Sequence, residues 1–75
     1  MRVTVEEVRK LPEGSRVLVH SCDRYGQPQY LDCRVIKKGR FNALKFNDWR
    51  GFPHEVGIKK LKDDYYNYYE VIEEV

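Results

Sequence analysis

Short β-prone runs, each followed by turn-forming residues, are the feature that most restricts how this chain can fold. The runs are rich in β-branched and aromatic residues and lie at residues 16–21, 29–37, 41–46, 52–56 and 65–72. Clusters of Gly, Pro, Asn and Asp separate them, and these residue types favour tight turns. This spacing predicts a mainly β domain with short connections between its strands.

Two short helical segments interrupt the β pattern. Thr4 and Glu7 have the spacing of a capping box, in which each side chain bonds to the other residue's backbone amide. Apolar residues then recur at helical spacing up to Pro12, which predicts a helix over about residues 5–10. Its inward side chains are expected to be Val5, Val8 and Leu11. Residues 57–61 predict a single helical turn before the last strand, directing Ile58 and Leu61 to the core.

The length of the chain limits what it can hold. Its 75 residues make a single domain, residues 1–75, whose core is thin and leaves little room for a deep substrate pocket. No apolar run approaches the roughly 20 residues needed to cross a bilayer, and the N-terminal segment lacks the apolar stretch of a signal peptide. We therefore expect a cytoplasmic protein with no membrane partner and with reduced cysteines.

The first hairpin can form in two registers. A hairpin symmetric about Gln27 and Pro28 would place Cys22 opposite Cys33 across the strands. A one-residue slip exchanges the two faces of a strand. We favour Val17 and Val19 inside, with an irregular loop restoring the register. The two cysteines are then interpreted as free, partly buried thiols rather than a cross-strand disulfide.

No residue pattern predicts catalysis or a metal site. The candidate ligands are His20, Cys22, Cys33 and His54, and they lack the close Cys-x₂₋₄-Cys or His-x₃₋₅-His pair that small zinc domains show. No Asp or Asn is placed to orient the imidazole of His20 beside Cys22. The glycines are scattered singly at turns and form no phosphate-binding loop. We expect no enzyme activity, no catalytic residue, no metal and no cofactor.

The charges of the chain are segregated along the sequence. Residues 34–62 contain nine basic residues and two acids, whereas residues 63–75 contain five acids and no base. Aromatic residues are interleaved with the bases, and cations beside rings suit nucleic acid or an acidic protein surface. These aromatic residues are Tyr30, Phe41, Trp49 and Phe52. The alternative is that the lysines are ordinary solubilising charges, partly neutralised by acids of the last strand.

Trp49 is the most informative single residue for binding. It lies in a turn between Asp48 and Arg50, where it either is exposed as a binding hot spot or folds back over the core. We favour exposure and expect the following contact residues, of which Arg40 and Lys45 steer a partner by charge: Trp49, Arg50, Phe52, Arg40, Lys45 and Lys38. An aromatic cage built from Tyr25, Trp49 and Phe52 would require the three rings to converge.

The tyrosines of the last run raise the same question of exposure. Alternation along a strand buries one set and exposes the other, so either Tyr69 and Val71 or Tyr66 and Tyr68 face the core. Two exposed tyrosines on an edge strand could pair with a second chain. The oligomeric state is left open, with an edge-strand dimer as one alternative. Pro53 suits an edge position for the fourth run.

The order of elements resembles the SH3-like small barrels of the Tudor and KOW type over about residues 13–73. Two segments also echo SH3 sequences, namely residues 49–53 (Trp-Arg-Gly-Phe-Pro) and residues 67–71 (Asn-Tyr-Tyr-Glu-Val). The resemblance implies a mainly β, five-stranded small barrel with a short N-terminal helix and a one-turn helix before the last strand. The spacing of the two segments differs from that of SH3 domains, so proline-rich peptides are not the expected ligand.

These features together predict a non-enzymatic regulatory or accessory protein. Its basic and aromatic surface is expected to contact another protein, one with an acidic surface or a pocket that accepts an aromatic side chain. Binding of RNA or DNA through residues 34–62 is the alternative. We favour a protein partner, because the acidic last strand would repel phosphate wherever it lies beside the basic segment.

Overall fold

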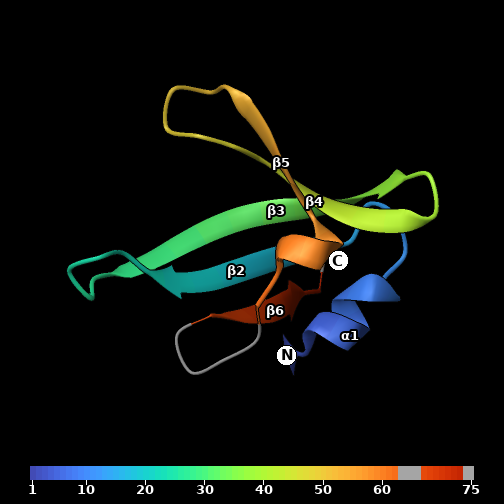
Figure 1. Ribbon diagram of the computed structural model, residues 1–75, viewed down its shortest axis with the longest axis horizontal. Coiled ribbons are helices and arrows are strands. Elements are labelled where there is room, and N and C mark those ends of the chain that lie inside the picture. The colour runs from blue at the N-terminus through green and yellow to red at the C-terminus, as the bar shows by residue number, and fades with distance from the viewer. Residues whose placement is uncertain (63–66, 74–75) are drawn as a thin grey trace.

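The computed structural model describes residues 1–62 and 67–73 and has a mainly β architecture with two short helical segments (Figure 1). In chain order the elements are β1 (Arg2–Val3), α1 (Val5–Arg9), β2 (Arg16–Cys22), β3 (Pro28–Lys38), β4 (Phe41–Asn47), β5 (Pro53–Gly57), the 3₁₀ turn η1 (Ile58–Lys60) and β6 (Tyr68–Ile72). The predicted mainly β class, the N-terminal helix and the helical turn before the last strand are confirmed.

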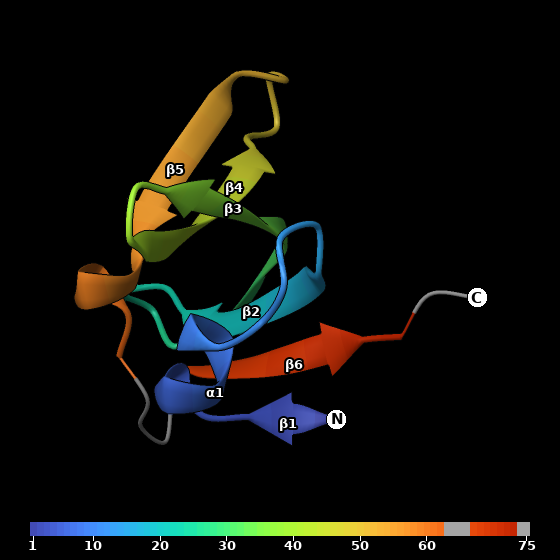
Figure 2. The ribbon, with the colours of Figure 1, turned by 90° about the vertical axis from the view of Figure 1, so that its right-hand side faces the viewer.

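All six strands belong to one antiparallel sheet with the order β1-β6-β2-β3-β4-β5. The sheet is strongly curved, and β5 rises away from the layer that contains β2 and β6 (Figure 2). It is not closed, because β1 and β5 remain as its two edges. The expected five-stranded barrel is therefore not confirmed, and the two-residue strand β1 was absent from the prediction.

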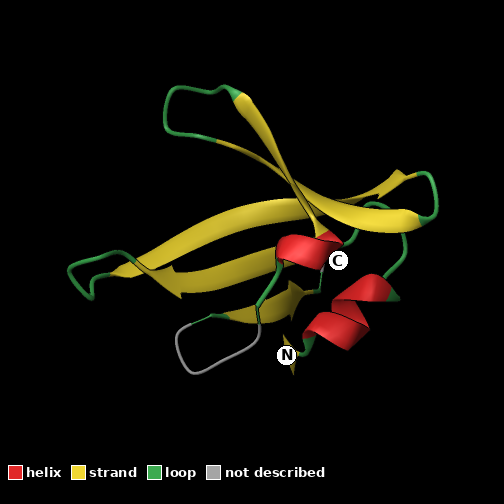
Figure 3. Cartoon of the chain, viewed as in Figure 1, coloured by secondary structure: helices red, strands yellow, loops and turns green. Residues whose placement is uncertain are grey.

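Helix α1 begins as its capping box requires. The backbone amide of Glu7 donates to Thr4 Oγ1 at 3.2 Å, and the amide of Thr4 donates to Glu7 Oε1 at 3.4 Å. Val8 is fully buried, and Val5 and Leu11 pack against the core beside it. The helix and η1 lie side by side against the sheet (Figure 3).

Asn42 fastens the end of α1 to the sheet. Its side chain is 4% exposed, and its Nδ2 donates to three backbone carbonyls at the end of the helix. The acceptors are the oxygens of Val8 at 3.0 Å, Arg9 at 3.0 Å and Leu11 at 3.1 Å. These hydrogen bonds add to the one that the carbonyl of Val8 accepts from the amide of Leu11 at 3.2 Å, and they tie the end of α1 to β4.

The core lies between the concave side of the sheet and the two helical segments. Its buried side chains come from nearly every element: Val3, Val8, Val17, Cys33, Val35, Leu44, Ile58 and Tyr69. The hydroxyl of Tyr69 donates to the carbonyl of Lys62 at 2.6 Å. Of the two tyrosine sets, the one with Tyr69 and Val71 inside is correct, whereas Tyr65 and Tyr66 lie outside the described residues.

The first hairpin adopts the register with the valines inside. Val17 is opposite Cys33 and Cys22 is opposite Pro28, so the register that pairs Cys22 with Cys33 is wrong. Both cysteines are free; Cys22 is exposed, whereas burial and the charge of Asp32 raise the pKa of Cys33 to about 11. The loop of residues 23–27 sets this register, because it connects the strands with five residues rather than two.

The last strand lies inside the sheet rather than at its edge. β6 pairs with β1 on one side and with β2 on the other, through Val3 opposite Tyr69 and Val17 opposite Val71. The expectation that this run forms an edge strand is therefore wrong, because β6 has a neighbouring strand on each side. The edge position expected for Pro53 is confirmed, since β5 is the outermost strand on its side.

Candidate functional site

The loop between β4 and β5, residues 48–52, presents the most exposed aromatic side chain of the described chain. Trp49 is 92% exposed and Phe52 is 57% exposed. The alternative in which Trp49 folds back over the core is therefore wrong. We call these residues the tryptophan loop; it projects beyond the body of the sheet (Figure 1).

Asp48 determines the shape of the tryptophan loop. Its Oδ1 accepts hydrogen bonds from the backbone amides of Arg50 at 2.9 Å and Phe52 at 3.0 Å. The backbone closes the loop through the amide of Asp48 to the carbonyl of Phe52 at 2.9 Å, and through the amide of Gly51 to the carbonyl of Asp48 at 2.9 Å. Gly51 has a φ of 86°, which favours glycine.

His54 ties the same aspartate to the sheet. Its Nε2 lies 2.9 Å from Asp48 Oδ2, and its ring stacks on Phe46 with centroids 5.3 Å apart. The hydrogen bond from His54, helped by the two backbone amides, lowers the pKa of Asp48 below its usual 3.8. The loop is therefore held from within by backbone hydrogen bonds and from below by a side chain of β5.

Arg50 joins the two exposed rings into one surface. Its guanidinium carbon lies 5.5 Å from the ring centre of Trp49 and 5.0 Å from that of Phe52. The same guanidinium contacts Asp48 Oδ2 at 3.5 Å, which neutralises the only acidic group of the loop. The tryptophan loop thus offers two rings, one cation between them and almost no net charge.

The structure brings together three of the six predicted contact residues and separates the others. Lys38 and Arg40 lie at the β3–β4 turn, at the far end of β4 from the tryptophan loop, and a strand of seven residues spans about 20 Å. Lys38 Nζ pairs there with Glu55 Oε2 at 2.6 Å. Lys45 lies in the middle of β4, opposite Glu55 of β5. The basic segment is therefore not one surface with Trp49.

The three rings considered for an aromatic cage lie on two different loops, because Tyr25 is not part of the tryptophan loop. Tyr25 lies in the β2–β3 loop, where the guanidinium of Arg24 is 5.1 Å from its ring centre. This loop repeats the design of the tryptophan loop: Asp23 Oδ1 accepts from the amides of Tyr25 at 2.8 Å and Gln27 at 2.9 Å. The shared spacing Asp-x-x-Gly-x is the signal in the sequence that our prediction missed.

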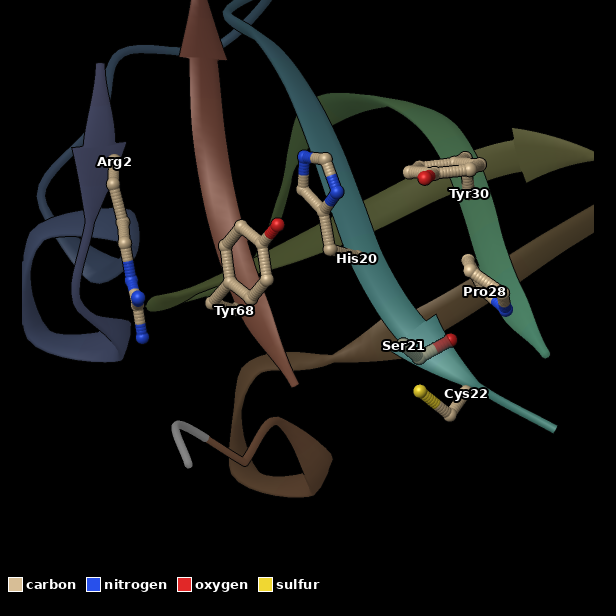
Figure 4. A pocket seen from close by; sticks show the side chains of 7 residues that line it. All are labelled: Arg2, His20, Ser21, Cys22, Pro28, Tyr30 and Tyr68. Atoms are coloured by element: carbon tan, nitrogen blue, oxygen red, sulfur yellow. The ribbon is translucent and has the colours of Figure 1, made fainter. Parts of the chain in front are cut away.

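A second feature that the sequence did not indicate is a row of stacked side chains across the convex face of the sheet. Arg2 lies 4.5 Å from the ring centre of Tyr68, Tyr68 stacks on His20 at 4.3 Å, and the edge of His20 meets Tyr30 at 5.1 Å. They line a hollow of about 410 Å³ (Figure 4). Because both faces of Tyr68 are covered by neighbours, its ring is not available for stacking by a ligand.

The part of the chain that the structure describes contains no cluster of three or more His, Cys, Asp or Glu side chains suited to a metal ion. None of the helices within residues 1–62 and 67–73 has the length and apolar character needed to cross a bilayer. Comparison of this chain with protein-family models, curated proteins and solved structures found no match.

Proposed function

We propose that this protein is a non-enzymatic binding module that inserts Trp49 into a pocket on a partner protein. The observation that carries the proposal is the 92% exposure of Trp49 on a loop fixed by Asp48. Tryptophan and arginine dominate the binding energy of many protein interfaces. A loop held in one shape by its own hydrogen bonds loses little conformational entropy on binding, so less of the favourable free energy of the Trp49 contact is offset.

The charge of the tryptophan loop favours a protein over nucleic acid at this position. Arg50 is its one cation and Asp48 its one acid, and the two contact each other. Nucleic-acid binding draws its affinity from several phosphate contacts, which a neutral loop does not supply. In this proposal Trp49, Arg50 and Phe52 make the contact, while Lys38, Arg40 and Lys45 attract an acidic partner from a distance.

The proposal can be tested by capture of partner proteins and then by the fluorescence of Trp49, which is the only tryptophan of the protein. Proteins captured from lysate by the immobilised wild type are compared with those captured by Trp49→Ala. Tyr25→Ala is the matched control, since Tyr25 is an exposed ring on a loop of the same design. We expect a protein captured by wild type and Tyr25→Ala to be absent with Trp49→Ala, and its addition to shift the Trp49 emission to shorter wavelength.

A partner retained by Trp49→Ala, with the fold of the variant verified by circular dichroism, would refute the assignment. Emission that stays at the wavelength of a solvated indole while the partner binds would refute it as well. A variant of Phe52 separates the contact from the loop shape, because Phe52 contributes only its backbone to the Asp48 network. Phe52→Ala should therefore weaken binding without changing loop geometry.

We also infer a relationship to the SH3-like small barrels and a cytoplasmic location. The strand order β6-β2-β3-β4-β5, with η1 between β5 and β6, supports the first inference. The free cysteines support the second, because an exposed thiol such as that of Cys22 persists more readily in a reducing compartment.

A further inference from the structure

A second concave surface lies at the end of β4 opposite the tryptophan loop, where η1 packs against the sheet. It has a volume of about 430 Å³ and is lined by the exposed ring of Phe41, by the small residues Ala43 and Gly57, and by Lys38, Lys59 and Lys60. Ala43 and Gly57 are neighbours on paired strands, and their small size leaves the space open. We call this surface the lysine groove.

The lysine groove is positively charged. Three lysines and one acid, Glu55, line it, which gives a local balance of +2. Lys38 Nζ pairs with Glu55 Oε2 at 2.6 Å, so Lys59 and Lys60 contribute the excess charge. Lys59 Nζ lies 5.1 Å from the ring centre of Phe41, which places an ammonium directly beside an aromatic face that is 53% exposed.

We propose that the lysine groove binds single-stranded nucleic acid, with one base stacked on Phe41 and the adjacent phosphates held by Lys59 and Lys60. Aromatic rings beside a run of cations are the arrangement by which proteins hold single strands without reading their sequence. The volume suits a group of nucleotide size. A single strand is required, because the bases of a duplex are stacked on one another and cannot lie on Phe41.

The contact between Lys59 and Phe41 is compatible with this occupant. A cation on an exposed ring is held weakly, whereas a base stacked on an aromatic side chain is held more strongly. An arriving base therefore displaces the ammonium from the ring, and the ammonium then meets the phosphate of the same nucleotide. A carboxylate-rich peptide would satisfy the lysines but would leave the face of Phe41 without a planar partner.

Gly57 gives the sharpest test of the site. Its backbone, at φ −69° and ψ 151°, suits any residue, and a Cβ built there meets nothing within 4 Å. Gly57→Leu therefore fills the lysine groove without strain and without a change in charge. We expect it to weaken binding of a fluorescent oligothymidylate or oligouridylate of about ten nucleotides by tenfold or more at about 50 mM salt. Unchanged affinity would overturn the proposal.

Phe41→Ala separates stacking from charge. Removal of the ring on which one base stacks is expected to weaken binding by about 5- to 100-fold. Phe41→Ala and the wild type should bind an abasic oligomer of equal length with the same affinity. If the wild type binds the abasic oligomer or polyglutamate as tightly as the base-containing strand, the groove is a general anion site and the proposal fails.

Lys59→Ala and Lys60→Ala should each weaken binding of both oligomers. Each should also reduce the slope of log K against log salt by about 0.7 for every phosphate that the variant no longer neutralises. Arg24→Ala is the control for net charge, because Arg24 lies in the β2–β3 loop outside the groove. An equal decrease in affinity with Arg24→Ala would show that binding follows overall charge rather than this site.

We expect Glu55→Gln to strengthen oligonucleotide binding, whereas the lysine variants should weaken it. Removing the carboxylate frees Lys38 and removes repulsion of phosphate, so the affinity should rise severalfold and more than it does in Glu6→Gln. Glu6 is the carboxylate of another exposed ion pair, with Arg9, and does not line the groove. Equal effects of the two variants would count against the site. Trp49→Ala should leave oligonucleotide binding unchanged, which keeps this proposal separate from that for the tryptophan loop.

Discussion

Single polar side chains determine much of the local structure of this protein. Asp48 organises the tryptophan loop by accepting hydrogen bonds from two backbone amides and by contacting His54. Asn42 does the same for the end of α1 by donating to three carbonyls. In a domain with so thin a core, a buried polar group that loses its partner costs a large fraction of the total stability.

We expect Asn42→Ala to lower the free energy of unfolding by about 1–3 kcal/mol, because the carbonyls of Val8, Arg9 and Leu11 lose the hydrogen bonds that Asn42 Nδ2 donates. Urea unfolding followed by circular dichroism measures the change. Asn47→Ala is the matched control, since Asn47 is an exposed asparagine on the same strand and should change stability by no more than about 0.5 kcal/mol. Equal stability of the two variants would contradict a capping role for Asn42.

At the scale of the elements, two hairpin loops of the same design shape the sheet. Residues 23–27 and 48–52 share an aspartate that accepts two amides and a glycine with positive φ, at 79° for Gly26 and 86° for Gly51. Each loop lifts an aromatic residue and an arginine away from the strands. The difference is His54, which pairs with Asp48, whereas the second oxygen of Asp23 accepts from the side-chain amide of Gln29.

The contact between Asp48 and His54 makes the tryptophan loop sensitive to acid. The pKa of Asp48 is lower in the folded protein than its usual 3.8, so its contribution to stability is fully present above pH 3.8 and is lost as the pH falls through the folded pKa. We expect Asp48→Asn to be less stable than wild type at about pH 5, with a gap that narrows on acidification below 3.8.

Urea unfolding followed by circular dichroism at several pH values measures this gap. The side chain of asparagine keeps Oδ1, which accepts the hydrogen bonds from the amides of Arg50 and Phe52. The variant therefore removes the charge of Asp48 and keeps the structure of the loop. Asp23→Asn is the control, because its loop has the same acceptor geometry without the paired histidine. A gap for Asp48→Asn that stays constant down to acid pH would refute the explanation.

At the scale of the whole molecule, the first and last strands, β1 and β6, pair in the sheet. β6 is inserted between β1 and β2, and the N-terminal amine lies 3.2 Å from the carbonyl of Val71. Val3, at 4% exposure, is opposite the buried Tyr69. The two-residue strand β1 therefore covers one side of the core that β6 alone would leave open.

We expect Val3→Ala to lower the free energy of unfolding by about 2 kcal/mol, since two buried methyl groups are removed and a small cavity remains. Arg2→Ala, on the exposed side of the same strand and in contact with Tyr68, should cost less than about 1 kcal/mol. Thermal and urea unfolding compare the two. A cost for Val3→Ala no larger than that for Arg2→Ala would mean that β1 adds little to the core.

The sequence predicted the local elements well and the arrangement of their side chains less well. Capping residues and turn formers located α1 and η1, and the β-prone runs located β2 to β5 to within one or two residues of their ends. β1 escaped prediction because two residues carry no periodic signal and form a strand only beside β6. The contacts among Arg2, Tyr68, His20 and Tyr30 were also not predicted, because these residues lie on four different strands and meet only when the sheet forms.

The sequence by itself determined the strands β2 to β6, the turns and the two helical segments, because those choices depend on interactions between residues a few positions apart. Only the tertiary structure decided the register of Cys22 and Cys33, the exposure of Trp49, and the separation of Trp49 from Lys38 and Arg40. These depend on loop length and on which strands become neighbours. The Asp-x-x-Gly-x loops are local, but which register and which neighbouring strands result is settled by burying one face of the whole sheet.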